Sequence, residues 1–251
     1  MNLTVDIGNT NIMLCFFKEE NIFSFKNIGI ESLNKKTILN FVNQSYIDKK
    51  ELCVLISSVV PEITRFFTNI FDIERINYFF ARKVAKKFNL KTNLKNKSTI
   101  GDDRLINSIY AKFLYSKSVI IIDFGTATTL DVLDRNGIYD GGVITPGIDL
   151  SLKSLQQGTA KLPLVKFKKT KKIVGKSTTE AIQSGFFWGY VSMIEGLINK
   201  IQREKKEKFK IILTGGNSNY FSGFFENVVK NDELFNSKAL NFLIIKYLRI
   251  K

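Results

Sequence analysis

Short apolar runs separated by turn residues mark the beginning of the chain. We expect strands at Leu3–Ile7, Ile12–Phe17 and Ile22–Phe25, because each run has the length and composition of a strand. Gly8 and Asn9 join the first two runs, and both residue types tolerate a positive φ. The pattern therefore predicts a tight hairpin followed by a third strand.

Helical spacing appears after these strands. An apolar stripe predicts a helix over Leu33–Tyr46, and the continuous apolar run Leu52–Ile56 predicts a fully buried strand. Pro61 fits the first turn of a short helix that reaches Phe67. A further helix is expected from Asp103 to Tyr115.

The second half of the chain repeats this order. Strands are expected at Val119–Ile122, Thr129–Leu133 and Ile138–Ile144, with Asn136-Gly137 as a hairpin turn. The later elements that we expect are a long helix over Thr179–Ile201, a buried strand at Ile211–Leu213, and helices near Phe221–Val228 and Lys238–Leu248. Two similar sets of strands and helices indicate two α/β domains with mixed sheets, residues 1–116 and 117–251, with a ligand in the cleft between them.

The composition narrows the chemistry of these domains. The chain has no histidine, which excludes serine–histidine and cysteine–histidine mechanisms and the usual zinc sites. General-base work then falls to a carboxylate, and any metal must be a hard cation with oxygen ligands. Cys15 and Cys53 lie in separate apolar runs, as expected of reduced thiols in a cytoplasmic protein. We expect no membrane partner, because no apolar run is long enough to span a bilayer and no leader pattern opens the chain.

The net charge of +15 raises the question of nucleic-acid binding. The densest basic run, Lys161–Lys176, contains little aromatic residue beyond Phe167, and no helix-turn-helix or zinc-finger spacing accompanies it. A solvated lysine-rich loop explains the run better than a specific nucleic-acid site. Its charge can also attract an anionic nucleotide.

A six-residue motif occurs once in each half. Asp6-Ile-Gly-Asn-Thr-Asn11 has a counterpart in Asp123-Phe-Gly-Thr-Ala-Thr128, and each copy follows an apolar strand. The glycine lets backbone amides approach phosphate oxygens, and the neighbouring amide and hydroxyl side chains add donors. Asp6 can hold Mg²⁺ through water. One copy alone is equally a hairpin turn, whereas two copies favour phosphate binding and a nucleotide-using phosphotransferase.

Gly101-Asp102-Asp103-Arg104 opens the helix at the end of the first half. Two acids at a helix N-terminus are what a simple cap requires, and the arginine is compatible with an ordinary ion pair. Beside two phosphate turns, the same residues form a coherent acceptor site, with a carboxylate for the acceptor hydroxyl and an arginine for an anionic group. Gly175-Lys176-Ser177 is not a P-loop, because Thr170 stands at the position of the first glycine and no strand precedes it.

Taken in order, these motifs resemble those of the type III pantothenate kinases, which belong to the acetate and sugar kinase/Hsp70/actin superfamily. The matching segments are DIGNTN from Asp6, SSVVPE from Ser57, GDDR from Gly101, IIDFGTATTLDV from Ile121, GGVITPGIDLSLKSL from Gly141, TTEAIQSGFFWG from Thr178 and LTGGN from Leu213. They run along essentially the whole chain. The resemblance implies two RNase H-like (actin-like ATPase) α/β domains with an interdomain nucleotide cleft.

The resemblance also implies an activity: ATP-dependent phosphorylation of pantothenate to 4'-phosphopantothenate, the first step of coenzyme A biosynthesis. It implies Mg²⁺, a monovalent cation (K⁺ or NH₄⁺) and a homodimer. By position, ATP binding falls to Asp6, Ile7, Gly8, Asn9, Thr10, Asn11, Ile12, Met13 and Thr126. The pantothenate pocket is expected at Gly101, Asp102, Asp103, Arg104 and Thr178. Asp103 is expected to be the general base, and Asp123 to hold the monovalent cation.

The chain departs from the family pattern at Leu94, where a tyrosine is common, and at Lys97, where a proline is common. Leu94 cannot donate a hydrogen bond, and the loss of one neutral hydrogen bond typically costs about 0.5–1.5 kcal/mol. Two alternatives stay open: a regulatory or accessory protein of the same family, and a kinase of another small hydroxyl compound. A regulator would be free to lose the acids, whereas all three of the expected acids are present.

Overall fold

The computed structural model describes residues 1–44, 49, 51–116 and 118–249, and these form two compact units. Unit 1 comprises Met1–Lys91, Lys95–Phe113 and Leu234–Lys251, and unit 2 comprises Thr92–Leu94 and Leu114–Glu233. Apart from Thr92–Leu94, the chain passes from unit 1 to unit 2 between Phe113 and Leu114. The C-terminal segment, however, returns to unit 1.

Unit 1 is built on a five-stranded sheet with the order β3-β2-β1-β4-β5. Its strands are β1 (Asn2–Ile7), β2 (Asn11–Lys18), β3 (Asn21–Gly29), β4 (Cys53–Ser58) and β5 (Tyr78–Phe80). Its helices are α1 (Lys35–Asn43), α2 (Pro61–Ile73), α3 (Ala81–Ala85), α4 (Asp102–Tyr115) and α7 (Phe235–Arg249), with 3-10 turns at Ile30–Ser32, Lys86–Phe88 and Lys97–Thr99. The first three strands are antiparallel, while β4 is parallel to β1 and β5 is parallel to β4.

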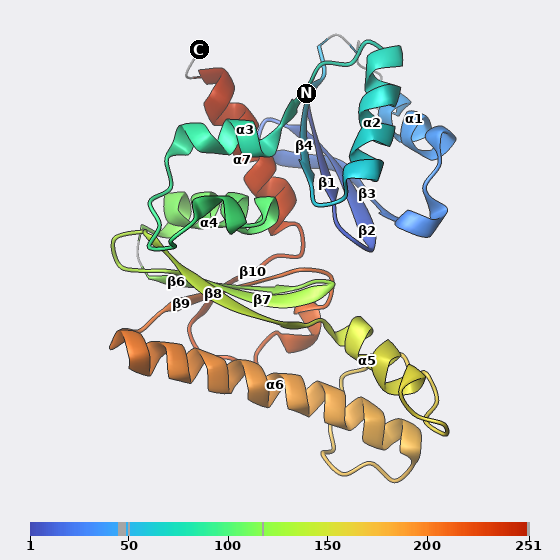
Figure 1. Ribbon diagram of the computed structural model, residues 1–251, viewed down its shortest axis with the longest axis vertical. Coiled ribbons are helices and arrows are strands. Elements are labelled where there is room, and N and C mark those ends of the chain that lie inside the picture. The colour runs from blue at the N-terminus through green and yellow to red at the C-terminus, as the bar shows by residue number, and fades with distance from the viewer. Residues whose placement is uncertain (45–48, 50, 117, 250–251) are drawn as a thin grey trace. The chain divides into compact units, whose positions relative to one another are not determined.

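Helices cover both faces of this sheet. The α1 and α2 helices lie on one face, as Figure 1 shows, and bury a core in which Phe16 stacks on Phe41 with ring centroids 5.1 Å apart. On the other face α7 packs against β1, β2 and β4. The C-terminal helix thus completes unit 1, because the strand residues of that face would otherwise remain uncovered.

Unit 2 contains a second five-stranded sheet, with the order β10-β9-β6-β7-β8. Its strands are β6 (Val119–Phe124), β7 (Ala127–Leu133), β8 (Tyr139–Pro146), β9 (Lys210–Thr214) and β10 (Val228–Asn231). Its helices are α5 (Ile148–Gln157) and α6 (Thr178–Lys205), with a 3-10 turn at Ser218–Phe221. The long α6 helix runs along one face of the sheet (Figure 1) and buries Ile120, Ile122 and Phe124 beneath it.

The two sheets share one topology. In each, three antiparallel strands are followed by two parallel strands on the other side of the first strand. This confirms the prediction of two similar α/β domains with mixed sheets, and it places both copies of the repeated motif at equivalent positions, between the first and second strands of each sheet.

Two local predictions differ from the structure. The helix expected over Phe221–Val228 is wrong: the segment consists of turns that lead into β10, because Gly223 (φ +83°) and Asn227 (φ +58°) adopt left-handed conformations that end helical geometry. The first hairpin turn forms without a positive φ at Gly8 or Asn9. In the second hairpin, Gly137 does have a positive φ (+66°), as the Asn-Gly pair predicts.

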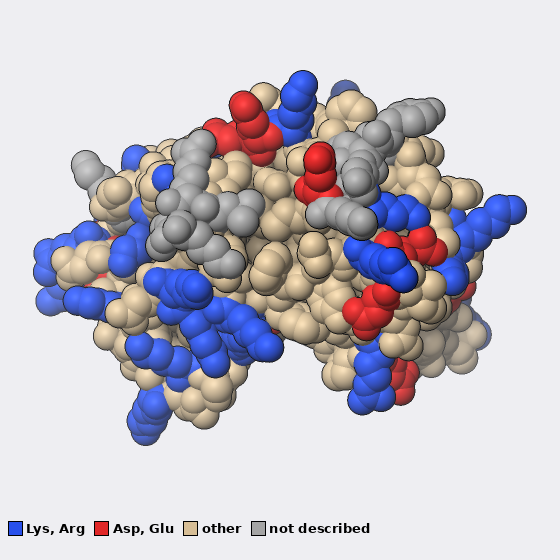
Figure 2. Space-filling model, turned by 90° about the horizontal axis from the view of Figure 1, so that it is seen from above, with Lys and Arg blue, Asp and Glu red and all other residues tan. Residues whose placement is uncertain are grey.

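The surface of the described part is basic. Figure 2 shows that lysine and arginine side chains predominate over acidic ones on the face drawn. The lysines of the segment between α5 and α6 are all exposed, in agreement with a solvated loop. None of the described helices combines the length and the apolar composition that a membrane span requires. Cys15 and Cys53 are free thiols, and burial raises the pKa of both.

Candidate active site

The first copy of the motif forms the turn between β1 and β2 in unit 1. The amide of Gly8 donates to the carbonyl of Asn11 over 3.0 Å and closes the hairpin. The side chains of Asn9, Thr10 and Asn11 are exposed, as phosphate-binding donors must be, whereas Ile7 and Ile12 are buried in the core. Ile7 and Ile12 can therefore contribute only backbone atoms to a ligand.

Asp6 is the penultimate residue of β1 and lies among polar groups from three other elements. Its Oδ2 accepts a hydrogen bond from Asn236 Nδ2 of α7 at 2.7 Å, and it also accepts from Ser57, its register partner in β4. The pKa of Asp6 is raised from 3.8 to about 7, chiefly by desolvation and also by the negative charges of Asp103 and Asp102, while the two hydrogen bonds oppose the rise. The turn of the first motif and the start of α4 therefore lie close together within unit 1.

The predicted acceptor site opens α4. Asp103 Oδ1 accepts from the amide of Arg104 at 2.8 Å, so the first turn of the helix fixes this carboxylate. A Cβ at position 101 would lie 2.6 Å from the same oxygen, which explains why Gly101 precedes the acids. Asp103 therefore satisfies one of the free amides of the first helical turn, and this hydrogen bond positions its carboxylate.

Asp102 is held differently from Asp103. Arg82 Nε lies 2.7 Å from Asp102 Oδ1, and Arg82 Nη2 also donates to the carbonyl of Ile100 at 2.7 Å. Burial raises the pKa of Asp102, while the Arg82 charge opposes that change and Asp103 adds to it. Arg82 therefore holds both the Asp102 carboxylate and the backbone segment that leads into α4.

The second copy of the motif forms the turn between β6 and β7 in unit 2. A Cβ at Gly147 would lie 2.2 Å from the carbonyl oxygen of Thr126, and a Cβ at Gly215 (φ +86°) would lie 2.3 Å from Asp123 Oδ1. The amide of Gly147 donates to Thr126 at 3.1 Å. Gly147 and Gly215, which are distant in sequence, thus pack directly against this turn. A residue with a Cβ could not approach it as closely.

Thr178 begins α6, the helix that Ser177 caps by accepting from the amide of Glu180. Thr178 also lies on a largely apolar groove of about 600 Å³ in unit 2. Gly185 and Gly189 line this groove at positions where an added Cβ would meet nothing within 4 Å. The groove is wide enough for a small organic molecule.

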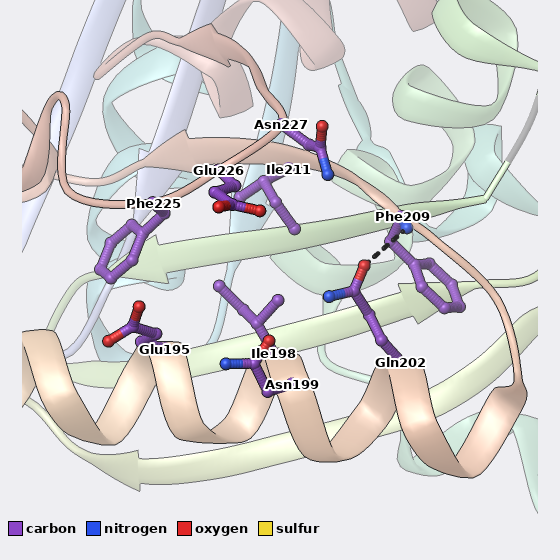
Figure 3. Close-up of a pocket in the computed structure, with 9 residues that line it drawn as sticks. All are labelled: Glu195, Ile198, Asn199, Gln202, Phe209, Ile211, Phe225, Glu226 and Asn227. Atoms are coloured by element: carbon purple, nitrogen blue, oxygen red, sulfur yellow. Dashed lines mark hydrogen bonds between the residues drawn. The ribbon is translucent and has the colours of Figure 1, made fainter.

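A smaller cavity of about 100 Å³ lies between α6 and the segment before β10 (Figure 3). Its lining residues are Glu195, Ile198, Asn199, Gln202, Phe209, Ile211, Phe225, Glu226 and Asn227. Gln202 already accepts from the amide of Phe209 at 3.2 Å. The cavity includes none of the residues expected from the sequence, and it is not the candidate site.

Three residues of the site were missed by the sequence reasoning. Ser57 had a signal, since it begins the SSVVPE segment at the end of a buried strand. Arg82 and Asn236 had none, because each reaches the site from a helix whose sequence carries no motif. In the described part of the chain, the acidic residues form no group of three or more that could hold a metal ion directly.

Comparison with known proteins identifies the family of the chain. Residues 2–200 match the family model described as type III pantothenate kinase. A protein of that name from Pelagibacter ubique (strain HTCC1062) is 39% identical over 238 residues, covering 92% of this chain and 91% of the relative.

Two solved structures share the fold. A Campylobacter jejuni protein of the Baf family is 19% identical, with a TM-score of 0.63 over 98% of this chain and 99% of that one. Component A of the (R)-2-hydroxyglutaryl-CoA dehydratase of Acidaminococcus fermentans is 12% identical, with a TM-score of 0.54 over 99% and 98%. With two mixed sheets of one topology, a pair of acidic turns and a family match over most of its length, the chain belongs to the type III pantothenate kinases.

Proposed function

We propose that this protein phosphorylates pantothenate with ATP as the phosphoryl donor and forms 4'-phosphopantothenate, the first step of coenzyme A biosynthesis. The observation that carries the proposal is the arrangement within unit 1, where the charge of Asp103 acts on Asp6 of the first turn. A candidate base beside a phosphate-binding turn is what transfer to a hydroxyl requires. Membership in the family supplies the identity of the acceptor.

Asp103 is the proposed general base. Its Oδ1 is held by the backbone at the start of α4, so that the carboxylate has a fixed orientation toward an acceptor hydroxyl. Gly101, Asp102, Arg104 and Thr178 are proposed to contact pantothenate. Because Arg82 holds Asp102 in an ion pair, Asp102 contributes to the shape of the pocket and is a poorer candidate for the base.

The two turns are proposed to bind ATP. The exposed side chains of Asn9, Thr10 and Asn11 supply donors, and Thr126 supplies a hydroxyl. Backbone atoms of residues 6–13 complete the first turn. Phosphoryl transfer depends mainly on positioning and on donors around the developing charge, and such groups provide both.

The residues present fit the two cations that the family implies. The buried Oδ1 of Asn236, which has no hydrogen-bond partner in the described part of the chain, and the Asp6 carboxylate are acceptors suited to waters around Mg²⁺. Asp123 offers carboxylate oxygens to K⁺ or NH₄⁺ in the second turn, where Gly215 packs so closely that a Cβ would lie 2.3 Å from Asp123 Oδ1. Bound cations supply positive charge that offsets the negative charge developing on the phosphates.

The test is release of ADP from purified protein with ATP, Mg²⁺ and pantothenate, in potassium and in sodium buffer. We expect pantothenate-dependent turnover that needs potassium. Asp103→Asn should retain ATP binding and lower kcat at least about 100-fold, the usual scale of general-base catalysis. Asp102→Asn is the matched comparison. Should Asp102→Asn lose turnover while Asp103→Asn keeps it, the assignment of the base is wrong.

We further propose a cytoplasmic homodimer, on the strength of the family resemblance. Sedimentation analysis of the purified protein tests the dimer, since a monomer at assay concentration would contradict it.

A further inference from the structure

Asn236 lies in the first turn of α7, at 230 sequence positions from Asp6, to which it donates. Its neighbours fix that turn in place. Phe235 is fully buried, with its ring centroid 5.0 Å from that of Tyr110 in α4, and Ser237 is almost completely buried. The packing of α7 on α4 therefore determines where the Asn236 amide can reach.

The two polar atoms of the Asn236 side chain are used unequally. Nδ2 donates to Asp6 Oδ2 at 2.7 Å, a short, charge-assisted hydrogen bond when Asp6 is ionised. Oδ1 is buried and has no hydrogen-bond partner in the described part of the chain. An orphaned buried acceptor is unfavourable, so this arrangement suits a site at which a hydrogen-bond donor is supplied by a ligand.

We propose that Asn236 is a positioning residue for phosphoryl transfer. Its N–H group holds the Asp6 carboxylate in one orientation, and its Oδ1 accepts a hydrogen bond from the water shell of the nucleotide-bound Mg²⁺. The inference rests on the proposed function and extends it to a residue outside all of the sequence motifs. Water bound to a divalent cation is a strong donor, and an amide oxygen beside a carboxylate completes a pair of acceptors for it.

The same helix offers a matched control. Asn241 is also buried and also uses its amide, because Nδ2 donates to the carbonyl of Glu19 at 2.7 Å and Oδ1 accepts from Asn2 at 2.8 Å. Both asparagines tie α7 to the sheet of unit 1. Of these two asparagines, only Asn236 contacts Asp6. If both served only to attach α7 to the sheet, replacing either one by alanine would have similar effects.

The experiment compares Asn236→Ala with Asn241→Ala and the wild type. Three quantities are measured: kcat and KM for ATP at low and high Mg²⁺, the calorimetric affinity for ATP with and without Mg²⁺, and the urea midpoint without nucleotide. We expect both variants to lose stability. Asn236→Ala alone should lose about 10-fold or more in kcat/KM for ATP at low Mg²⁺, with partial recovery at high Mg²⁺. Asn241→Ala should keep the wild-type values.

Wild-type kinetics and Mg²⁺ dependence in a folded Asn236→Ala protein would overturn the inference. If that variant does not fold, Asn236→Ser, which keeps a small polar group, is measured in its place. If the wild type itself releases no pantothenate-dependent ADP, the proposed function fails. In that case the affinity for ATP in the presence of Mg²⁺ still tests the role of Asn236. Equal affinities of the wild type and Asn236→Ala would refute the inference.

Discussion

The Asp6 carboxylate should destabilise the folded protein at neutral pH, and Asp6→Asn should remove that cost. The pKa of Asp6 is about 7 in the folded protein and 3.8 in the absence of the fold, so the folded state binds the proton more tightly than the unfolded chain. Below about pH 4 Asp6 is protonated in both states and does not change the free energy of unfolding. As the pH rises from about 4 to about 7, the free energy of unfolding falls, and above about pH 7 the penalty stays constant.

The size of the effect follows from the two pKa values. Each pKa unit corresponds to about 1.4 kcal/mol, so the penalty is about 2 kcal/mol at pH 5 and reaches about 4 kcal/mol at pH 8. Asp6→Asn should accordingly gain little stability over the wild type near pH 4, and the gain should grow with pH. Asn236 can still donate to the oxygen of the new amide, so the local packing is preserved.

Urea denaturation of both proteins between pH 5 and pH 8, without nucleotide, measures this difference in the free energy of unfolding. Glu20→Gln, a change at an exposed carboxylate in the β2–β3 turn of the same unit, is the control and should show no comparable trend. A difference between Asp6→Asn and wild type that is constant over this range would refute the reasoning. So would a variant less stable than the wild type at pH 8.

Two further changes test the supports of the site. Gly215→Ala should lower the free energy of unfolding by at least about 1–2 kcal/mol, because its positive φ and its contact with Asp123 both oppose a Cβ. Gly216→Ala, with nothing within 4 Å of its Cβ, should be nearly neutral, and equal urea midpoints for the two variants would contradict this account. Arg82→Gln should cost about 1–3 kcal/mol, and more at pH 7 than at pH 4, because ionised Asp102 then loses its partner. A pH-independent loss in urea denaturation would argue against the ion pair.

The strands and the turns of the repeated motif could be predicted because their signals are local. An apolar run such as Leu52–Ile56 predicts a buried strand wherever it occurs, and the structure has β4 at Cys53–Ser58. The three residues of β5 (Tyr78–Phe80) are too few for such a pattern. The apolar residues of Phe221–Val228 were wrongly interpreted as a helix; its aromatic residues pack in the core of unit 2, where Phe221 stacks on Phe124 with ring centroids 4.4 Å apart.

The surroundings of each acid could not be predicted, because they depend on distant parts of the chain. Helical spacing in Lys238–Leu248 predicts that a helix forms there, but not that its first turn reaches the end of β1. Similarly, a glycine pair after a buried strand is a weak signal until the structure places Gly215 against Asp123. Sequence patterns identified the acids, whereas tertiary packing determines how each is held.

The repeat allows a comparison of two similar acids for which we propose different tasks. Asp6 and Asp123 occupy equivalent places in their sheets, and each is paired in register with a buried hydroxyl residue, Ser57 or Thr214, on the adjacent parallel strand. The next neighbour differs. In unit 1 an amide from α7 contacts the carboxylate, while in unit 2 the residue after Thr214 is Gly215, which packs so closely that a Cβ would lie 2.3 Å from Asp123 Oδ1. A carboxylate held by a protein donor suits contact with a hydrated ion, so the Asn236 contact supports the proposed assignment of Mg²⁺ to Asp6. The proposed assignment of the monovalent cation to Asp123 rests on the family resemblance.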